Sequence, residues 1–172
     1  MGRLFRAMAA LCVALQLAAC AGSSAIESQT RQRDGRLARI YLLREKGIIG
    51  ALGGTAATAD VKVDGKTVGA LRNGFYIFVD RPPGLHTLSA QTGISMAFET
   101  EVQVEAGQVY YFNIGAPTGG GPGHQLVSQL YAGGSGEVTR PKSMLSDGFS
   151  GVALYRLDPA AGAAILEQLQ AP

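Results

Sequence analysis

The feature that most constrains the fold is a succession of short apolar runs separated by turn residues, which begins near residue 37. Residues 98–104 alternate between buried-type side chains and Glu or Gln, as in a strand with one face in water. Strands are expected at residues 38–43, 60–63, 67–71, 74–80, 85–91, 97–104 and 108–114, with weaker candidates at 125–131 and 151–155. The pattern predicts a mainly β chain, a single antiparallel β-sandwich of about seven strands.

Turn residues indicate how these runs are connected. Asp64 and Gly65 favour a two-residue hairpin because both positions accept positive φ. Residues 105–107 are expected to join the runs on either side of them as a hairpin. The run GAPTGGGPG at 115–123 is expected to be an exposed loop, because glycine loses much backbone entropy on ordering and proline cannot donate to a ladder. Residues 158–172 are expected to form a short C-terminal helix or a tail, with Asp158 as the helix cap.

The first residues have the composition of a secretory signal peptide. Arg3 and Arg6 precede an apolar stretch at residues 7–17, which is shorter than the roughly 20 residues of a membrane span. The segment 1–19 is therefore predicted to be a signal peptide that is removed. An ordinary cleaved leader that leaves a free thiol behind it is the alternative.

The end of this leader, Leu17-Ala18-Ala19-Cys20, resembles the lipobox of bacterial lipoproteins. The resemblance implies that Cys20 carries diacylglycerol, that cleavage follows Ala19, and that the new amino terminus is acylated, as with palmitate. Two or more acyl chains hold a protein stably in a bilayer, since each buried methylene contributes roughly 0.8 kcal/mol. Ala21 stands where an Asp resembles an inner-membrane retention signal. We therefore expect an outer-membrane anchor with the domain facing the periplasm.

The segment after the leader differs in composition from the apolar runs. Residues 20–36 are polar, small and of mixed charge, which predicts a lipidated Cys20 followed by a flexible tether. The tether is expected to be a spacer, with a docking segment for a partner as the alternative. The β-sandwich domain then occupies residues 37–157.

Charge and composition exclude several classes of protein. The chain has 15 Lys and Arg against 13 Asp and Glu, and loss of the two leader arginines leaves 13 against 13. Nucleic acid is therefore not expected as a partner, because its binding needs an excess of positive charge. Cys12 lies in the leader, so no disulfide is expected. Two separated histidines, His86 and His124, and no usable thiol predict that no metal or other cofactor is bound.

Sequence motifs of catalysis are incomplete. The DGKT sequence at 64–67 lacks the first glycine of a phosphate-binding loop, because position 60 is Asp60. Ser135 and Ser150 lack the Gly-x-Ser-x-Gly surroundings of a hydrolase. His86 is expected to be a packed or surface residue of a strand. The chain is therefore not predicted to be an enzyme.

Several surfaces are candidates for binding. The glycine-rich run at 47–54 is expected to be an insertion between strands, or else a segment that enters lipid or a partner groove. Tyr76, Tyr110 and Tyr111 are expected in the core or in cross-strand pairs, with stacking on peptidoglycan sugars as the alternative. The remaining candidates are the loop 115–123 and the exposed strand face of Glu99, Glu101 and Gln103.

The runs ARIYLLR, VKVDGKTVGAL, GFYIFVDRPPGLHTL and VEAGQVYYFNI resemble a proteobacterial family of lipoprotein-associated domains of unknown function. Their order is also similar to the PEGA domain, a small β-sandwich in which a V-DG-K-VG hairpin precedes PG-H and a closing G-YY strand. The resemblance implies the fold and leaves the function open. We expect a membrane-anchored periplasmic lipoprotein that is a binding or structural module of the cell envelope, with an envelope protein or peptidoglycan as partner. An envelope hydrolase and an inhibitor of a foreign cell-wall hydrolase are the alternatives.

Overall fold

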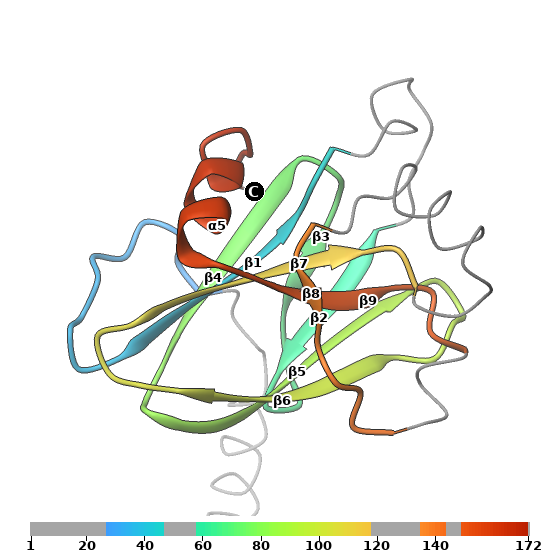
Figure 1. Cartoon of the computed structure of the whole chain (residues 1–172), viewed down its shortest axis with the longest axis horizontal. Helices are drawn as coiled ribbons and strands as arrows, with labels where there is room; N and C mark the ends of the chain where they lie inside the picture. The colour runs from blue at the N-terminus through green and yellow to red at the C-terminus, as the bar shows by residue number, and fades with distance from the viewer. Residues whose placement is uncertain (1–26, 47–57, 118–134, 144–148, 172) are drawn as a thin grey trace, which may run out of the picture.

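The computed structural model describes residues 27–46, 58–117, 135–143 and 149–171. Within these residues the chain forms two β-sheets and a short C-terminal helix (Figure 1). The first sheet has the order β4–β1–β7–β9–β8, with β1 (Ala38–Arg44), β4 (Phe75–Arg81), β7 (Val109–Gly115), β8 (Glu137–Val138) and β9 (Ala153–Leu157). The second has the order β3–β2–β5–β6, with β2 (Ala59–Val63), β3 (Lys66–Leu71), β5 (Gly84–Thr92) and β6 (Phe98–Val104). The predicted mainly β sandwich is confirmed.

The expected strands correspond closely to the observed ones. All seven runs expected before residue 115 are present as β1 to β7, and the candidate at 151–155 is β9. The two-residue β8 is not predicted by the pattern, because two residues are too few to show a period. The candidate strand at 125–131 and the segments 47–54 and 118–123 lie outside the described residues. The exposed loop expected at 115–123 is corrected at its start, because Gly115 ends β7 and both Gly115 and Ala116 are buried.

Burial along the strands follows the period of the sequence. In β6 the side chains of Phe98, Thr100, Val102 and Val104 are buried between the sheets, and the intervening Glu and Gln side chains are exposed. β2 shows the same alternation. Inward side chains of both sheets form the core, whose largest fully buried members are Ile40, Leu42, Leu71, Ile77, Leu88, Phe98, Phe112, Ile114 and Leu154.

The turn between β2 and β3 has the geometry that its sequence favours. Asp64 and Gly65 have φ values of 52° and 74°, and β2 pairs with β3 on either side of them. Two successive positive φ values give a turn whose twist matches that of the paired strands. The hairpin interpretation of the DGKT sequence is confirmed.

Two strand pairings differ from the prediction. β6 pairs with β5, and β7 pairs with β1 and β9, so residues 105–107 carry the chain from the second sheet to the first. The hairpin expected there is wrong. β1 and β7 run parallel, which makes the first sheet mixed rather than antiparallel. Alternation assigns the faces of a strand but not its neighbours, because the period is the same beside any partner.

Helix α5 (Pro159–Leu166) packs on β7 of the first sheet (Figure 1). Asp158 caps the helix as predicted, accepting hydrogen bonds from two N–H groups of the first turn at 3.0 Å. Gly162 is buried against Tyr111, where an added Cβ would lie 2.6 Å from the Tyr111 Cβ. The missing side chain therefore allows the helix to approach the sheet closely.

The last part of the predicted tether lies against β4. The side-chain amide of Gln29 donates to the carbonyl of Phe78 at 3.2 Å and accepts from the Phe78 N–H at 2.7 Å. The carboxylate of Glu27 lies 2.6 Å from the guanidinium of Arg81. These contacts satisfy polar groups at the edge of the sheet.

The prediction of a flexible tether over residues 20–36 is therefore corrected for residues 27–36. The composition of this segment indicates solubility, but composition does not show that its polar side chains have partners on a sheet edge. Residues 20–26 lie outside the described residues.

Candidate functional site

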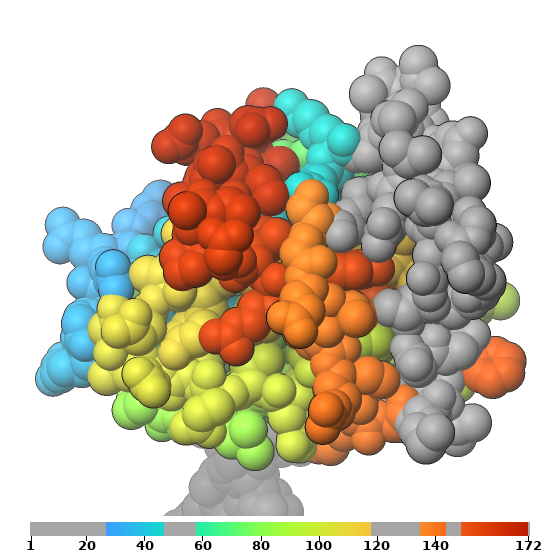
Figure 2. Space-filling view, viewed as in Figure 1, coloured from blue at the N-terminus to red at the C-terminus, as the bar shows by residue number. Residues whose placement is uncertain are grey.

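The candidate site is a groove between β6 of the second sheet and β8 and β9 of the first. It comprises two hollows of about 650 and 300 Å³, one towards the start of β8 and one towards its end. Glu137 and Arg156 line both hollows. Figure 2 looks onto this face, where the orange segment 135–143 crosses beside the red of α5 and the yellow-green of β6.

Strand pairing places the central residues of the groove in one row. Arg156 of β9 is paired with Phe112 of β7 on one side and with Glu137 of β8 on the other. Residues opposite each other in a sheet share a face, so the side chain of Arg156 leaves the sheet on the same face as that of the buried Phe112. Its side chain is nevertheless exposed, and its guanidinium lies 5.6 Å from the ring centre of Tyr110. This cation–π contact holds the guanidinium beside Tyr110, which lines the larger hollow.

Two cations of the groove have no anionic partner within the described part of the chain. Arg140 and Arg156 are exposed, and neither forms an ion pair there. Lys142, in contrast, lies 2.8 Å from Glu101, and this hydrogen bond raises the pKa of Lys142. Arginine binds carboxylate and phosphate groups through parallel N–H donors. The groove therefore offers two guanidinium groups to an anionic ligand.

The strand face predicted as a partner surface borders this groove. Glu101 and Gln103 line the smaller hollow together with the buried Val102. The hydroxyl of Thr100 donates to the carbonyl of Arg140 at 2.8 Å, which holds the segment after β8 against β6. Sequence and structure therefore indicate the same side of the molecule.

The sequence pattern does not predict the basic residues of the groove. Arg156 interrupts the otherwise buried run ALYRL of β9, and an isolated charge in an apolar strand indicates a position that reaches solvent. Arg140 and Glu137 lie in a segment without periodicity, and nothing in the pattern indicates that they approach β6.

His86 lies in strand β5, and of the packed and surface positions that the sequence leaves open it takes the packed one. Its Nδ1 lies 2.8 Å from a carboxylate oxygen of Asp64, and its Nε2 lies 2.8 Å from the carbonyl oxygen of Pro82. Burial on its own raises the pKa of Asp64, but hydrogen bonds from His86 and from the N–H of Thr87 hold it below its ordinary value. The imidazole thus joins the β2–β3 turn to the start of β5.

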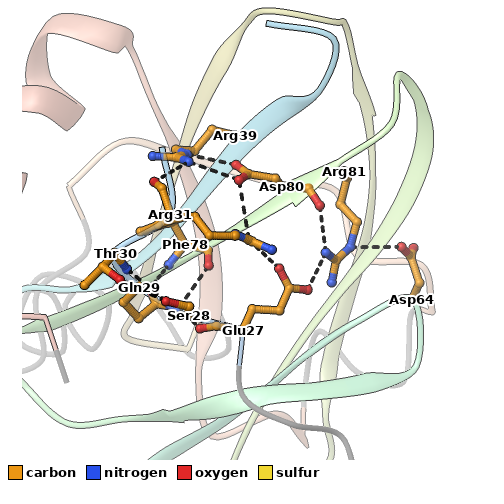
Figure 3. A network of polar contacts seen from close by, with 10 residues as sticks. All are labelled: Glu27, Ser28, Gln29, Thr30, Arg31, Arg39, Asp64, Phe78, Asp80 and Arg81. Atoms are coloured by element: carbon orange, nitrogen blue, oxygen red, sulfur yellow. Dashed lines mark hydrogen bonds and ion pairs between the residues drawn. The ribbon is translucent and has the colours of Figure 1, made fainter. Parts of the chain in front are cut away.

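A charged network beside this histidine also has a structural role (Figure 3). Arg39 and Asp80 form a buried ion pair at 2.8 Å, which raises the pKa of Arg39. The guanidinium of Arg39 lies 4.0 Å from the ring centre of Phe78. Arg81 lies 3.7 Å from Asp64 and so connects the network to the turn. These charges are paired within the chain, so the network holds elements together rather than binding a ligand.

The three tyrosines considered for sugar stacking do not form one platform. Tyr111 stacks on Tyr41 with 5.2 Å between ring centres and 8° between ring planes, and Tyr41 also contacts Tyr76 at 5.9 Å. Tyr110 lies on the opposite face of β7, where it packs against the core. The interpretation of core or cross-strand packing is confirmed, with Tyr76 and Tyr111 in cross-strand contacts and Tyr110 packed against the core.

The remaining candidates contribute no site within the described residues. Neither Ser135 nor Ser150 has a hydroxyl bonded to a histidine or carboxylate there, and the Ser150 Oγ is buried without a hydrogen-bond partner. No group of three or more acidic, histidine or cysteine side chains in the described part is suited to a metal ion. The helix described there is neither long nor apolar enough to cross a bilayer. Leu17, Ala18, Ala19, Cys20 and His124 lie outside the described residues.

Comparison with known proteins gives one family. The family described as "Protein of unknown function (DUF2846)" matches residues 35–124, which are 90 of the 172 residues. No curated protein matches the chain. The matched region contains β1 to β7 and ends before β8, β9 and α5. The groove therefore combines residues of two parts of the chain. Glu101 and Gln103 lie within the region that matches the family, whereas Arg140 and Arg156 follow it.

Proposed function

Because the chain belongs to the DUF2846 family of proteins of unknown function, we propose its role from its own residues: a lipid-anchored binding module of the bacterial cell envelope. One observation carries the binding role, namely that Arg140 and Arg156 line a groove without ion-pair partners among the described residues. Guanidinium groups in a recess with apolar and polar walls suit a ligand that carries an anionic group.

The anchor is proposed from the sequence Leu17-Ala18-Ala19-Cys20. A bacterial lipobox at the end of a signal peptide supports lipidation of Cys20, and Ala21 supports the outer membrane over the inner one. The order of the VKVDGKTVG, PGLH and GQVYY runs supports a relationship to the PEGA domain. Together these features support a periplasm-facing lipoprotein.

The contacts of Glu27 set the reach of such an anchor. Cys20 and Glu27 are 27 − 20 = 7 residues apart, and a fully extended chain of this length spans about 25 Å at most. While Glu27 stays paired with Arg81, the sandwich is held close to the bilayer. A partner that reaches the groove is then another component of the envelope, such as a membrane protein or peptidoglycan.

The anchor is tested by replacing Cys20 and comparing the two cysteines of the chain. Cys20→Ser should abolish incorporation of labelled fatty acid and move the protein out of the detergent-soluble membrane fraction. Cys12→Ser is the matched control, because Cys12 lies within the apolar leader, and it should leave labelling and fractionation unchanged. A Cys20→Ser protein that is cleaved and fractionates like the parent contradicts the proposed anchor.

The binding role is tested in intact cells with a photo-crosslinking residue in the groove. Placed at Val138, which is 44% exposed and lines the smaller hollow, it should form a defined adduct. Placed at the exposed Lys62 of β2, away from the groove, it should not. Arg156→Met should weaken the Val138 adduct. Equal adducts from both positions, or an adduct that is insensitive to Arg156, contradict the proposed site.

A further inference from the structure

We propose that the groove binds a peptide in extended conformation, which adds to β6 as a further strand and places a carboxylate beside Arg140 and Arg156. The inference rests on the proposed binding function and deepens it by naming the chemistry of the ligand. In strand addition, main-chain hydrogen bonds supply affinity and pockets for alternate side chains supply specificity.

The outer edge of β6 is occupied at its two ends and open between them. Near the start, the carbonyl of Glu99 accepts a hydrogen bond at 2.7 Å from the segment that follows β8. Just past the end, the N–H of Glu105 donates to the hydroxyl of Tyr110 at 3.0 Å. Between these points the main chain of Glu101 and Gln103 has no partner on this side among the described residues.

Strand pairing determines which way these groups point. Thr87 of β5 is the register partner of Glu101. The N–H and C=O of Thr87 bond instead to Asp64, at 3.0 and 2.9 Å, on the side away from β6. Opposite residues of an antiparallel ladder exchange both hydrogen bonds or neither. The N–H and C=O of Glu101 therefore point outward, and those of Gln103, two residues on, do the same.

The outer edge of β4 gives a comparison, because its main-chain hydrogen-bonding groups are paired with other segments of the chain. Gln170 pairs with it at one end, donating to the carbonyl of Gly74 and accepting from the N–H of Tyr76, both at 3.0 Å. In the middle of β4, the side-chain amide of Gln29 forms hydrogen bonds with both the N–H and the C=O of Phe78. An open edge invites another chain to pair, and proteins usually cover it. The edge of β6 differs from that of β4, because the main-chain groups of Glu101 and Gln103 have no such partner among the described residues. This unpaired stretch lies at the smaller hollow.

The walls of this hollow suit the side chains of an extended peptide. Val138, which is 44% exposed, lines the hollow together with the buried Val102 and Phe112. Side chains of a strand alternate between faces, so one set would enter the hollow while the other points to solvent. The hollow therefore supplies the alternate contacts that give specificity to strand addition.

The charge of the hollow selects the anionic group. Glu101 is paired with Lys142 at 2.8 Å. The other charged side chains that line the hollow are Arg140, Arg156 and Glu137, which leaves an excess of one positive charge. A side-chain or terminal carboxylate on the peptide balances that charge and matches the paired N–H donors of a guanidinium.

The open edge is tested first in the full-length protein in detergent micelles, by amide hydrogen exchange. The N–H groups of Thr100 and Val102 bond to β5 and should exchange at least about tenfold more slowly than those of Glu101 and Gln103. Equal protection of all four amides would mean that the edge is already occupied, and would overturn the proposal.

Binding is then tested with a pool of N-acetylated octapeptides of random sequence, selected on the same full-length protein. Selected peptides should contain Asp or Glu, or use their terminal carboxylate, and should protect the amides of Glu101 and Gln103 from exchange. N-methylation of the peptide should weaken binding about tenfold at every second residue and little at the residues between them. This period of two tests strand addition without any change to the protein.

Protein variants test the same contacts from the other side. Gln103→Pro removes the outward N–H, which an edge strand tolerates, and should weaken peptide binding about tenfold. Gln103→Ala keeps that N–H and should bind within about threefold of the parent. Arg156→Met should weaken carboxylate-bearing peptides, whereas Arg72→Met, outside the groove, should not.

The outcomes separate this inference from the proposed function. A selected peptide that leaves exchange at Glu101 and Gln103 unchanged, or that tolerates N-methylation at every residue, overturns strand addition. If no peptide is selected, the inference fails. An adduct from Val138 in cells would still support the binding module, then with a ligand other than a peptide, such as a glycan.

Discussion

The side-chain amide of Gln29 makes the two hydrogen bonds with Phe78 that a neighbouring strand would make with it. One amide group thus replaces a piece of main chain at the edge of β4 (Figure 3). Since Gln170, which follows helix α5, pairs with the same edge, the segments from both ends of the sandwich meet on β4. The edge is protected from pairing with another molecule, and the N-terminal segment is held in place.

The first prediction concerns this amide. Gln29→Ala should destabilise the protein by about 1–2 kcal/mol, because the buried edge groups of Phe78 lose their partners. Gln29→Glu should also destabilise it, since a carboxylate accepts from the N–H of Phe78 but cannot donate to its carbonyl. Urea denaturation measures both effects.

Gln32→Ala is the matched control for this amide, because Gln32 is exposed and makes no hydrogen bond with the described residues. Its free energy of unfolding should stay within about 0.5 kcal/mol of the parent. If Gln29→Ala and Gln32→Ala unfold at the same urea concentration, the amide does not hold the edge.

The second prediction concerns pH. The pKa of Asp64 in the folded protein lies below its ordinary value of 3.8. Its stabilising contribution is therefore complete above that pH and is lost as the pH falls towards the folded-state pKa. Asp64→Asn should remove part of the stability at neutral pH and flatten the loss below about pH 4. Asn is suited to the test because it tolerates the φ of 52° at this position.

The size of this effect is limited by the partial exposure of the Asp64 side chain. Solvent screening reduces the contribution to about 1 kcal/mol or less. Thermal melts between about pH 2 and pH 7 measure it in parent and variant. An acid limb that is identical in Asp64→Asn and the parent would assign the pH dependence to other carboxylates. Glu27, whose pKa is lowered against its burial by hydrogen bonds from Arg81 and Arg31, is then the next candidate.

The third prediction compares two Asp–Arg pairs that differ in burial. Asp80 and Arg39 are each less than a tenth exposed, so Asp80→Ala should cost about 3–5 kcal/mol by leaving a buried guanidinium without its partner. Asp34 and Arg36 lie at a similar distance, 2.9 Å, but on the surface. Asp34→Ala should leave the unfolding midpoint unchanged, because exposed pairs are screened. Similar losses in the two variants would contradict the role of burial.

The sequence predicts the strands well because each carries its own period, as the alternation around Thr100 shows. It does not predict partners that are distant in the chain. Asp64 and His86 are each recognisable as turn-associated residues, yet their hydrogen bond joins positions 22 residues apart. The same limit explains the wrong hairpin at 105–107, because period-two alternation is satisfied by β6 and β7 in one sheet or in two.

The candidate site is predicted only in part for a related reason. Glu101 is identified because it alternates with buried residues in a regular strand. Arg140 lies in a segment without a period and is brought to β6 by the hydrogen bond that Thr100 donates to its carbonyl. Gln29 lies in a segment whose composition is that of a tether, and its role depends on its two hydrogen bonds with Phe78 of β4. Such contacts leave no pattern in the sequence.

The last prediction concerns the approach of α5 to the first sheet. In an isolated helix, replacing glycine by alanine is stabilising, because alanine has the higher helix propensity by about 1 kcal/mol. Gly162 should behave in the opposite way. A Cβ there would lie 2.6 Å from the Cβ of Tyr111, and the Tyr111 ring has little room to move because it stacks on Tyr41. Gly162→Ala should therefore destabilise the protein by about 1–3 kcal/mol, the usual cost of overpacking.

Gly35→Ala is the matched control, since nothing lies within 4 Å of the Cβ that it would add. It should be neutral or stabilise the protein by up to about 1 kcal/mol through the unfolded state. The clash predicts in addition that Tyr111→Ala partly rescues Gly162→Ala, so that the double variant is more stable than the sum of the single effects. Urea denaturation of the four proteins measures this coupling. Additive effects would show that Gly162 destabilises the helix itself, and that its contact with Tyr111 does not set the position of α5.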